Sequence, residues 1–320
     1  MEQTITPPNS RLTQKNFSAP NVIRLRDLIV NSYLISETNG TWCLVDAGMS
    51  PGHAEKIFQV AAQHFGAESK PAAIFLTHGH FDHVGSLKNL LRRWNVPVYA
   101  HRLEMPYLTG RASYPPADPT AGGGLMTRLS PLFPTTGIDV GNQVQTLPGD
   151  NSIPLMPSWK WIHTPGHTAG HVSFFRESDR TLIVGDAFVT VKNESAIAIL
   201  FQKQKVNRPP SSFTTDWEQA RQSVEKLADL RPTYAATGHG IPMHGNQLRE
   251  QLNDLAANFS GIMPKDGRYV REPAVADANG IRFLPPPISD PLPKMMGIIA
   301  ALTIGICVSR KIGKRKTRRS

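Results

Sequence analysis

Residues 76–85, LTHGHFDHVG, place three histidines and one aspartate within six positions. They come at the end of the apolar run AAIFL, which is typical of a buried strand. His78 and His80 are two residues apart, and in extended backbone such side chains point to the same side. Asp82 and His83 follow at the start of an expected helix. Because imidazole and carboxylate groups bind zinc and similar ions, this string predicts a metal site.

Three more residues that could bind a metal follow strand-like runs. The run WKWIHTPGH leads to His167, TLIVGDA leads to Asp186, and TYAATGHG leads to His239. If those strands lie side by side in a common direction, all seven groups meet at one edge of the fold. Seven ligands are too many for one zinc ion, but they suit two ions that share a bridging carboxylate and a bridging water.

The elements that must position these residues alternate along the chain. The apolar runs at 41–48, 72–80, 159–167, 181–187 and 233–240 predict strands. Helices are expected at 51–65, 84–94, 215–230 and 246–258. Strands mixed with covering helices indicate an α/β layered fold. The Pro- and Gly-rich segment 106–158 predicts a lid or wall of the site, since long loops inside a domain are usually functional.

Five motifs occur in order between residues 41 and 240: LVDAG, THGHFDHVG, TPGHTAGH, VGDA and TGHG. With them the chain resembles the metallo-β-lactamase fold superfamily, and in particular its glyoxalase-II-like hydrolase branch. The resemblance implies a four-layer αββα sandwich. It implies a first metal at His78, His80 and His167, and a second at Asp82, His83 and His239, with Asp186 bridging the two.

Two further residues are expected to support the ligands without binding metal. The resemblance implies this role for Asp46, which supports the metal loop in the family. His171 lies four residues after His167, and we expect it to be a hydrogen-bond partner. His53, His64, His101 and His244 are interpreted as surface or loop residues.

The expected chemistry is hydrolysis. Two divalent ions are expected, with zinc favoured and iron or manganese as alternatives. A zinc-bound water has a pKa of about 7 and supplies hydroxide at neutral pH, and Asp82 is placed to orient that water and carry its proton. We expect an ester-like bond of a small molecule, a thioester or a lactone, to be the target. A phosphodiesterase or nuclease-like member of the superfamily, and a non-catalytic metal-binding scaffold anchored to a membrane, stay open as alternatives.

The net charge of +10 comes from the C-terminal end of the chain. Eight of the 35 lysines and arginines lie from Lys294 onward, where there is no Asp or Glu, and the rest of the chain carries 27 basic against 25 acidic residues. A nearly neutral body argues against specific nucleic-acid binding. The two cysteines are too few for a disulfide framework or a cysteine zinc site. The oligomeric state is not indicated.

Four regions are expected: a polar N-terminal segment at 1–20, the metallo-hydrolase domain at 21–258, an extended Pro-rich linker at 259–293, and an apolar helix with a basic tail at 294–320. Residues 295–308 form an uncharged apolar run. As a helix it would span about 21 Å, shorter than a bilayer core of about 30 Å. We expect a cytoplasmic protein attached to the membrane by this transmembrane or interfacial helix. A helix packed on the body is the alternative.

Overall fold

The computed structural model describes residues 17–288. Its strands are β1 (Phe17–Ala19), β2 (Val22–Asp27), β3 (Val30–Ser36), β4 (Trp42–Val45), β5 (Ile74–Phe75), β6 (Val98–Ala100), β7 (Val144–Thr146), β8 (Trp159–His163), β9 (Val172–Arg176), β10 (Thr181–Gly185), β11 (Tyr234–Thr237), β12 (Met243–His244), β13 (Val275–Asp277) and β14 (Gly280–Phe283). Its α-helices are α1 (His53–Phe65), α2 (Phe81–Val84), α3 (Leu87–Trp94), α4 (Met105–Leu108), α5 (Leu125–Leu129), α6 (Ala196–Leu200), α7 (Trp217–Asp229), α8 (Gly245–Ala257), α9 (Phe259–Ile262) and α10 (Arg268–Arg271).

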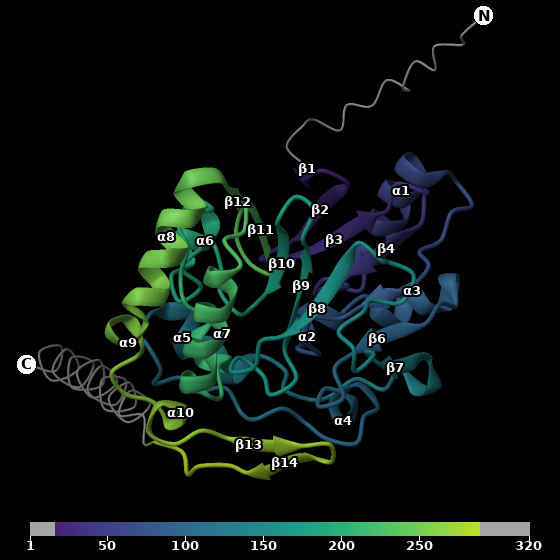
Figure 1. Ribbon diagram of the computed structural model, residues 1–320. Coiled ribbons are helices and arrows are strands. Elements are labelled where there is room, and N and C mark those ends of the chain that lie inside the picture. Colours follow the sequence, from purple (N-terminus) through teal and green to yellow (C-terminus); the bar gives the residue numbers. More distant parts are fainter. Residues whose placement is uncertain (1–16, 289–320) are drawn as a thin grey trace, which may run out of the picture. The chain divides into compact units, whose positions relative to one another are not determined.

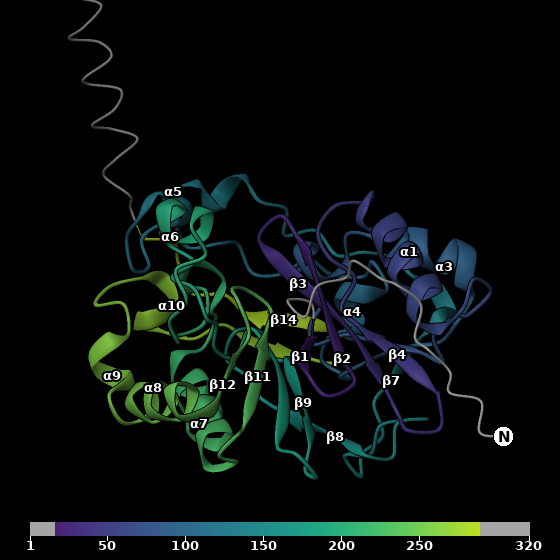
Figure 2. The same cartoon turned by 90° about the horizontal axis from the view of Figure 1, so that it is seen from above.

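Two sheets face each other between two layers of helices (Figures 1 and 2). The seven-stranded sheet has the order β1 to β7, with antiparallel pairs up to β4 and parallel pairs from β4 to β7. The five-stranded sheet has the order β12-β11-β10-β9-β8, and β10 and β11 form its parallel pair. In Figure 2, α1 and α3 cover the first sheet and α7 and α8 cover the second. The four-layer αββα fold predicted from the sequence is therefore confirmed.

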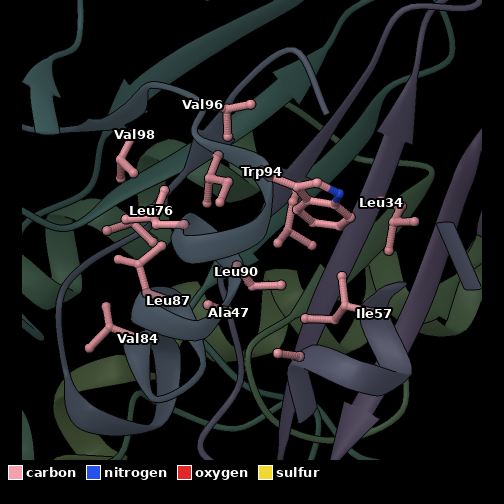
Figure 3. Close-up of a cluster of buried hydrophobic side chains, with 14 of the residues drawn as sticks. Leu34, Ala47, Ile57, Leu76, Val84, Leu87, Leu90, Trp94, Val96 and Val98 are labelled. Atoms are coloured by element: carbon pink, nitrogen blue, oxygen red, sulfur yellow. The ribbon is translucent and has the colours of Figure 1, made fainter. Parts of the chain in front are cut away.

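Three buried apolar clusters fill the three interfaces between these layers. The first joins α1 and α3 to the seven-stranded sheet and includes Ile57, Leu76 and Leu90 (Figure 3). The second lies between the sheets and includes Phe75 and Phe174. The third lies beneath α7 and α8. Because each layer buries apolar side chains on the next, the strand ends that carry the candidate ligands are held in fixed positions.

The helix expected at 84–94 is divided into α2 and α3. Gly85 interrupts it, and its backbone N–H donates to the Gly48 carbonyl oxygen (2.8 Å). A Cβ atom at Gly85 would lie only 1.8 Å from the Met49 carbonyl oxygen. The chain therefore needs glycine at this contact, and the break separates a short helix carrying Asp82 and His83 from the longer packed helix.

The regions expected at the two ends of the domain differ from the structure. Residues 17–19, placed in the polar N-terminal segment, form β1 and pair with β2. The extended-linker prediction is wrong for residues 259–283, which form α9, α10 and the β13–β14 hairpin. Phe259 and Tyr269 cause this, because both bury their rings in the third cluster. Local Pro content does not reveal such long-range contacts.

The predicted apolar helix and basic tail at 294–320 lie outside the described residues. Across residues 17–288, no helix has both the length and the apolar character needed to cross a bilayer. Membrane attachment through residues 295–308 stays a prediction.

Candidate metal centre

Each candidate ligand follows the carboxyl end of a strand. His78 and His80 follow β5 of the seven-stranded sheet. His167, Asp186 and His239 follow β8, β10 and β11 of the five-stranded sheet. The strands that lead to His167, Asp186 and His239 lie in one sheet, and the strand that leads to His78 and His80 lies in the facing sheet. The side chains meet nevertheless, because both sheets present these strand ends to the same place.

The Asp186 carboxylate lies at the centre of the cluster. Its Oδ2 atom is 3.1 Å from His239 Nε2, 3.6 Å from His167 Nε2 and 3.7 Å from His83 Nε2. His239 Nε2 is also 3.3 Å from Asp82 Oδ2. One carboxylate oxygen thus faces imidazoles from three different segments of the chain, an arrangement that would suit a group shared by two metal ions.

The seven predicted ligands come together in overlapping groups. All seven are buried. Within each of three groups the ligand atoms lie within 4.8 Å of one another: His78, His80 and His167; His78, His83 and Asp186; and Asp82, His83 and His239.

Three side-chain atoms of the candidate metal ligands have no hydrogen-bond partner within the described part of the protein. They are His78 Nε2, His83 Nε2 and Asp186 Oδ1, and all three are fully buried. A buried polar atom without a partner costs roughly 1–3 kcal/mol, so it points to an unrecorded ligand. Two divalent ions would supply the missing partners, and the donor set of imidazoles and carboxylates fits them.

The electrostatics divide the histidines into two kinds. Burial, reinforced by neighbouring imidazoles, holds the pKa of His78 and of His167 well below the usual range. Burial likewise lowers the pKa of His80 to about 4. At His239 burial acts in the same direction, but Asp186 and Asp82 outweigh it and raise the pKa to about 10. These shifts favour the neutral form of His78, His80 and His167, which metal binding requires, whereas at His239 a bound metal would have to displace a proton that Asp186 and Asp82 favour.

Asp46 connects two of the loops. Its Oδ1 accepts the Thr77 backbone N–H (2.8 Å), and its Oδ2 accepts the Thr77 hydroxyl (2.8 Å) and lies 2.8 Å from His83 Nδ1. Asp46 itself has a left-handed backbone, with φ of 58°. These contacts direct His83 Nε2 toward the cluster and fix the turn before His78. A carboxylate behind a metal-binding imidazole is a common arrangement that orients the ring and raises its basicity.

His171 lies behind Asp186. Its Nε2 accepts the backbone N–H of Asp186 (2.8 Å), and its Nδ1 lies 2.9 Å from Thr164 Oγ1. Both ring nitrogens are therefore engaged, which leaves neither for a metal. Of the histidines interpreted as surface or loop residues, His53 and His101 are in fact buried.

Glu104 was not identified from the sequence. It is fully buried. Its oxygens accept from the backbone N–H of Gly79 (3.0 Å) and of Gly170 (3.1 Å), from Thr168 Oγ1 (2.6 Å) and from the Tyr114 hydroxyl. Glu104 therefore joins the His78–His80 loop to the loop that carries His167. Its own segment, HRLEMPYL, offers no spacing signal that could have revealed these contacts.

A pocket opens beside the ligand cluster. Met126, Thr127 and Phe133 line it, so the segment 106–158 does form part of its wall, as the sequence predicts. Residues from α6 and from the 210–213 turn complete the wall. His80, Asp82 and Asp186 lie on its inner surface, and a molecule in the pocket would therefore touch the candidate metal centre.

The profile of the Metallo-beta-lactamase superfamily matches residues 25–239, and the chain belongs to that superfamily. The probable metallo-hydrolase YflN of Bacillus subtilis (strain 168) is 49% identical over 237 residues, which cover 73% of this chain and 89% of that protein. Hydroxyacylglutathione hydrolase of Salmonella typhi is 33% identical over 162 residues, 49% of this chain and 50% of that enzyme. Such relatives confirm the resemblance to the glyoxalase-II-like branch.

Solved structures agree in fold. The BLEG-1 B3 metallo-beta-lactamase has a TM-score of 0.52 at 24% identity, over 73% of this chain and 98% of that one. A beta-lactamase domain protein from Burkholderia ambifaria has a TM-score of 0.53 at 20% identity, over 76% and 75% of the two chains.

Proposed function

We propose that this protein is a hydrolase with two divalent metal ions, and that it cleaves an ester-like bond, in a thioester or a lactone, of a small molecule. The observation that carries the proposal is the convergence of three imidazoles on Asp186 Oδ2, at 3.1–3.7 Å. The name of the B. subtilis relative, a probable metallo-hydrolase, supports the reaction class. The name of the S. typhi relative, a hydrolase of a glutathione thioester, supports an acyl bond as the target.

The residues fall into two ligand sets joined by Asp186. His78, His80 and His167 would hold one ion, and Asp82, His83 and His239 would hold the other. Zinc is the favoured metal, because the donors are mainly imidazole nitrogens, with iron and manganese as alternatives. When bound, such ions polarise a carbonyl oxygen and lower the pKa of bound water to about 7.

The protein's own groups position the reactants. Asp82 lies on the inner wall of the pocket, where its carboxylate can orient the attacking water and carry its proton to the leaving group. Asp46 and Glu104 hold the loops that bear the histidines. His239 Nδ1 lies 2.9 Å from the Ile29 carbonyl oxygen, which fixes its ring so that Nε2 faces Asp82 and Asp186. Enzymes gain much of their rate from such fixed placement.

A hydrolysis panel tests this function. Metal-loaded protein is assayed against thioesters, lactones, simple esters and bis(4-nitrophenyl) phosphate. We expect turnover of thioesters or lactones, and we expect Asp82→Ala to lower kcat far more than His171→Ala, because both ring nitrogens of His171 already bond within the protein. Preferred turnover of the phosphodiester would assign the protein to the nuclease-like alternative. No turnover of any substrate by fully loaded protein would favour the non-catalytic scaffold.

A further inference from the structure

The outer wall of the pocket beside the candidate metal centre is apolar. Six half-buried apolar side chains line it: Ile29, Phe81, Met126, Phe133, Ile199 and Phe213. The Phe81 and Phe133 rings stack with centroids 5.7 Å apart, and Phe213 lies 6.4 Å from Phe133. Apolar side chains left half exposed around a concave site are typical of a surface that a ligand covers. An apolar wall of this kind suits a hydrocarbon part of a ligand, such as an acyl chain.

Apart from the candidate metal ligands, the pocket wall, formed within residues 17–288, carries no cationic side chain. None of its lining residues, all of them in the described part of the chain, is Lys or Arg. Besides the candidate ligands Asp82 and Asp186, Glu194 brings a carboxylate to the wall. Arg208 pairs with Glu194 at 3.1 Å, and that guanidinium is not among the lining residues, so it offers the pocket no cation. A carboxylate on the substrate would thus find no partner away from the metal ions.

Two polar atoms of the wall have no partner. They are Thr127 Oγ1, on a side chain that is 1% exposed, and Asn193 Oδ1. The Asn193 oxygen can only accept a hydrogen bond, while the Thr127 hydroxyl can donate or accept. Unpartnered buried groups in a pocket indicate where a ligand's polar group would bond. A donor on a ligand, such as an amide N–H, could bond to either oxygen.

We propose that the pocket binds a neutral substrate with an apolar acyl chain of several carbons, seated among Phe81, Phe133 and Phe213, and that Thr127 and Asn193 bind an amide-like group of that substrate. This rests on the proposed hydrolase function and names its substrate class. It sets this chain apart from a hydrolase of glutathione thioesters, because glutathione carries two carboxylates for which the pocket provides no cation.

The first test is direct binding, which does not depend on turnover. N-alkylacetamides with alkyl chains of two to eight carbons are titrated into the metal-loaded protein by calorimetry. We expect Kd to fall about fourfold for each added methylene, in line with the free energy of burying a CH₂ group. Phe133→Ala should flatten this dependence. The matched control is Phe201→Ala, since Phe201 is 75% exposed and does not line this pocket. A Kd independent of chain length in the wild type would overturn the proposal.

The second test uses turnover. Acyl thioesters of N-acetylcysteamine, a neutral thiol with an amide, are compared with glutathione thioesters of the same acyl groups. We expect at least tenfold higher kcat/KM for the neutral series and a rise with acyl length. Thr127→Val should raise KM by about tenfold with little change in kcat. Thr127→Ser, which keeps the hydroxyl, should have the KM of the wild type. Preference for the glutathione series would overturn the inference and leave the hydrolase function standing. Binding that strengthens with alkyl-chain length, without turnover of any thioester, would support the inference and contradict the proposed hydrolase function.

Discussion

Gly238 provides a sharp test of the ligand cluster, because it lies directly against Asp186. A Cβ atom at position 238 would be 2.1 Å from Asp186 Oδ1 and 2.9 Å from His83 Cε1. Real Cβ atoms almost never approach a heavy atom closer than 3.0 Å, so in Gly238→Ala the carboxylate must move by about 0.9 Å or the backbone must shift. The backbone at Gly238 does not have a positive φ, so alanine is strained here by the contact alone.

The expected effect on function is larger than the effect on stability. Overpacking of this kind costs roughly 1–3 kcal/mol of unfolding free energy. Displacing a positioned group by about 1 Å costs on the order of 10²-fold in rate. We therefore expect Gly238→Ala to fold, to lose at least one metal ion per chain and to lose about 10²-fold in kcat/KM.

The assays are elemental analysis, thermal unfolding and hydrolysis of the preferred substrate. Gly261→Ala is the matched control, since a Cβ atom there would meet nothing within 4 Å. If Gly238→Ala keeps both metal ions and full activity, Asp186 does not occupy the shared position that its geometry indicates.

Three further predictions concern the residues around the cluster. Asp46→Asn removes a carboxylate that lies 2.8 Å from His83 Nδ1, and competition with a chelator should show a 10–100-fold loss of metal affinity; unchanged affinity would refute the supporting role. Glu104→Ala leaves three buried donors without an acceptor, namely the Gly170 N–H and the hydroxyls of Thr168 and Tyr114. Urea denaturation should show a loss of about 3–5 kcal/mol, whereas a loss below about 1 kcal/mol would contradict these contacts. Burial, and after it the neighbouring His163, lower the pKa of His101 to about 3 in the folded protein. In the unfolded chain this histidine has its ordinary pKa of about 6.5, so below that pH the unfolded chain binds a proton that the folded protein does not. The free energy of unfolding therefore falls as the pH is lowered from about 7 to about 5. His101→Gln should reduce that fall by about 1–2 kcal/mol, and an unchanged fall would mean that His101 is protonated in the folded state.

The candidate ligands could be found from sequence because each one follows a buried strand within a short string. The two-residue period of side chains along a strand and the order of the motifs are enough to locate these ligands, and both can be read from short stretches of sequence. The strands lie in two sheets, but the candidate side chains converge at one place all the same. The alternation of apolar runs and helices predicts an α/β layered fold, and the resemblance to the superfamily implies its four-layer αββα form.

Other parts depend on contacts between distant residues, which local patterns do not encode. Glu104 acts on Gly79 and Gly170, which are 25 and 66 positions away along the chain. The Pro-rich segment after residue 258 folds because two aromatic rings, those of Phe259 and Tyr269, are buried in the third apolar cluster. The pocket wall likewise joins Phe81, Phe133 and Phe213, which no sequence period relates.

The central claim is that two metal ions lie between these seven side chains. Anomalous X-ray diffraction from crystals of the metal-loaded protein, measured at the absorption edge of the bound element, tests it most directly. Two peaks about 3.5–4 Å apart are expected, one among His78, His80 and His167 and the other among Asp82, His83 and His239, with Asp186 in contact with both. A single peak, or peaks away from Asp186, would contradict the account.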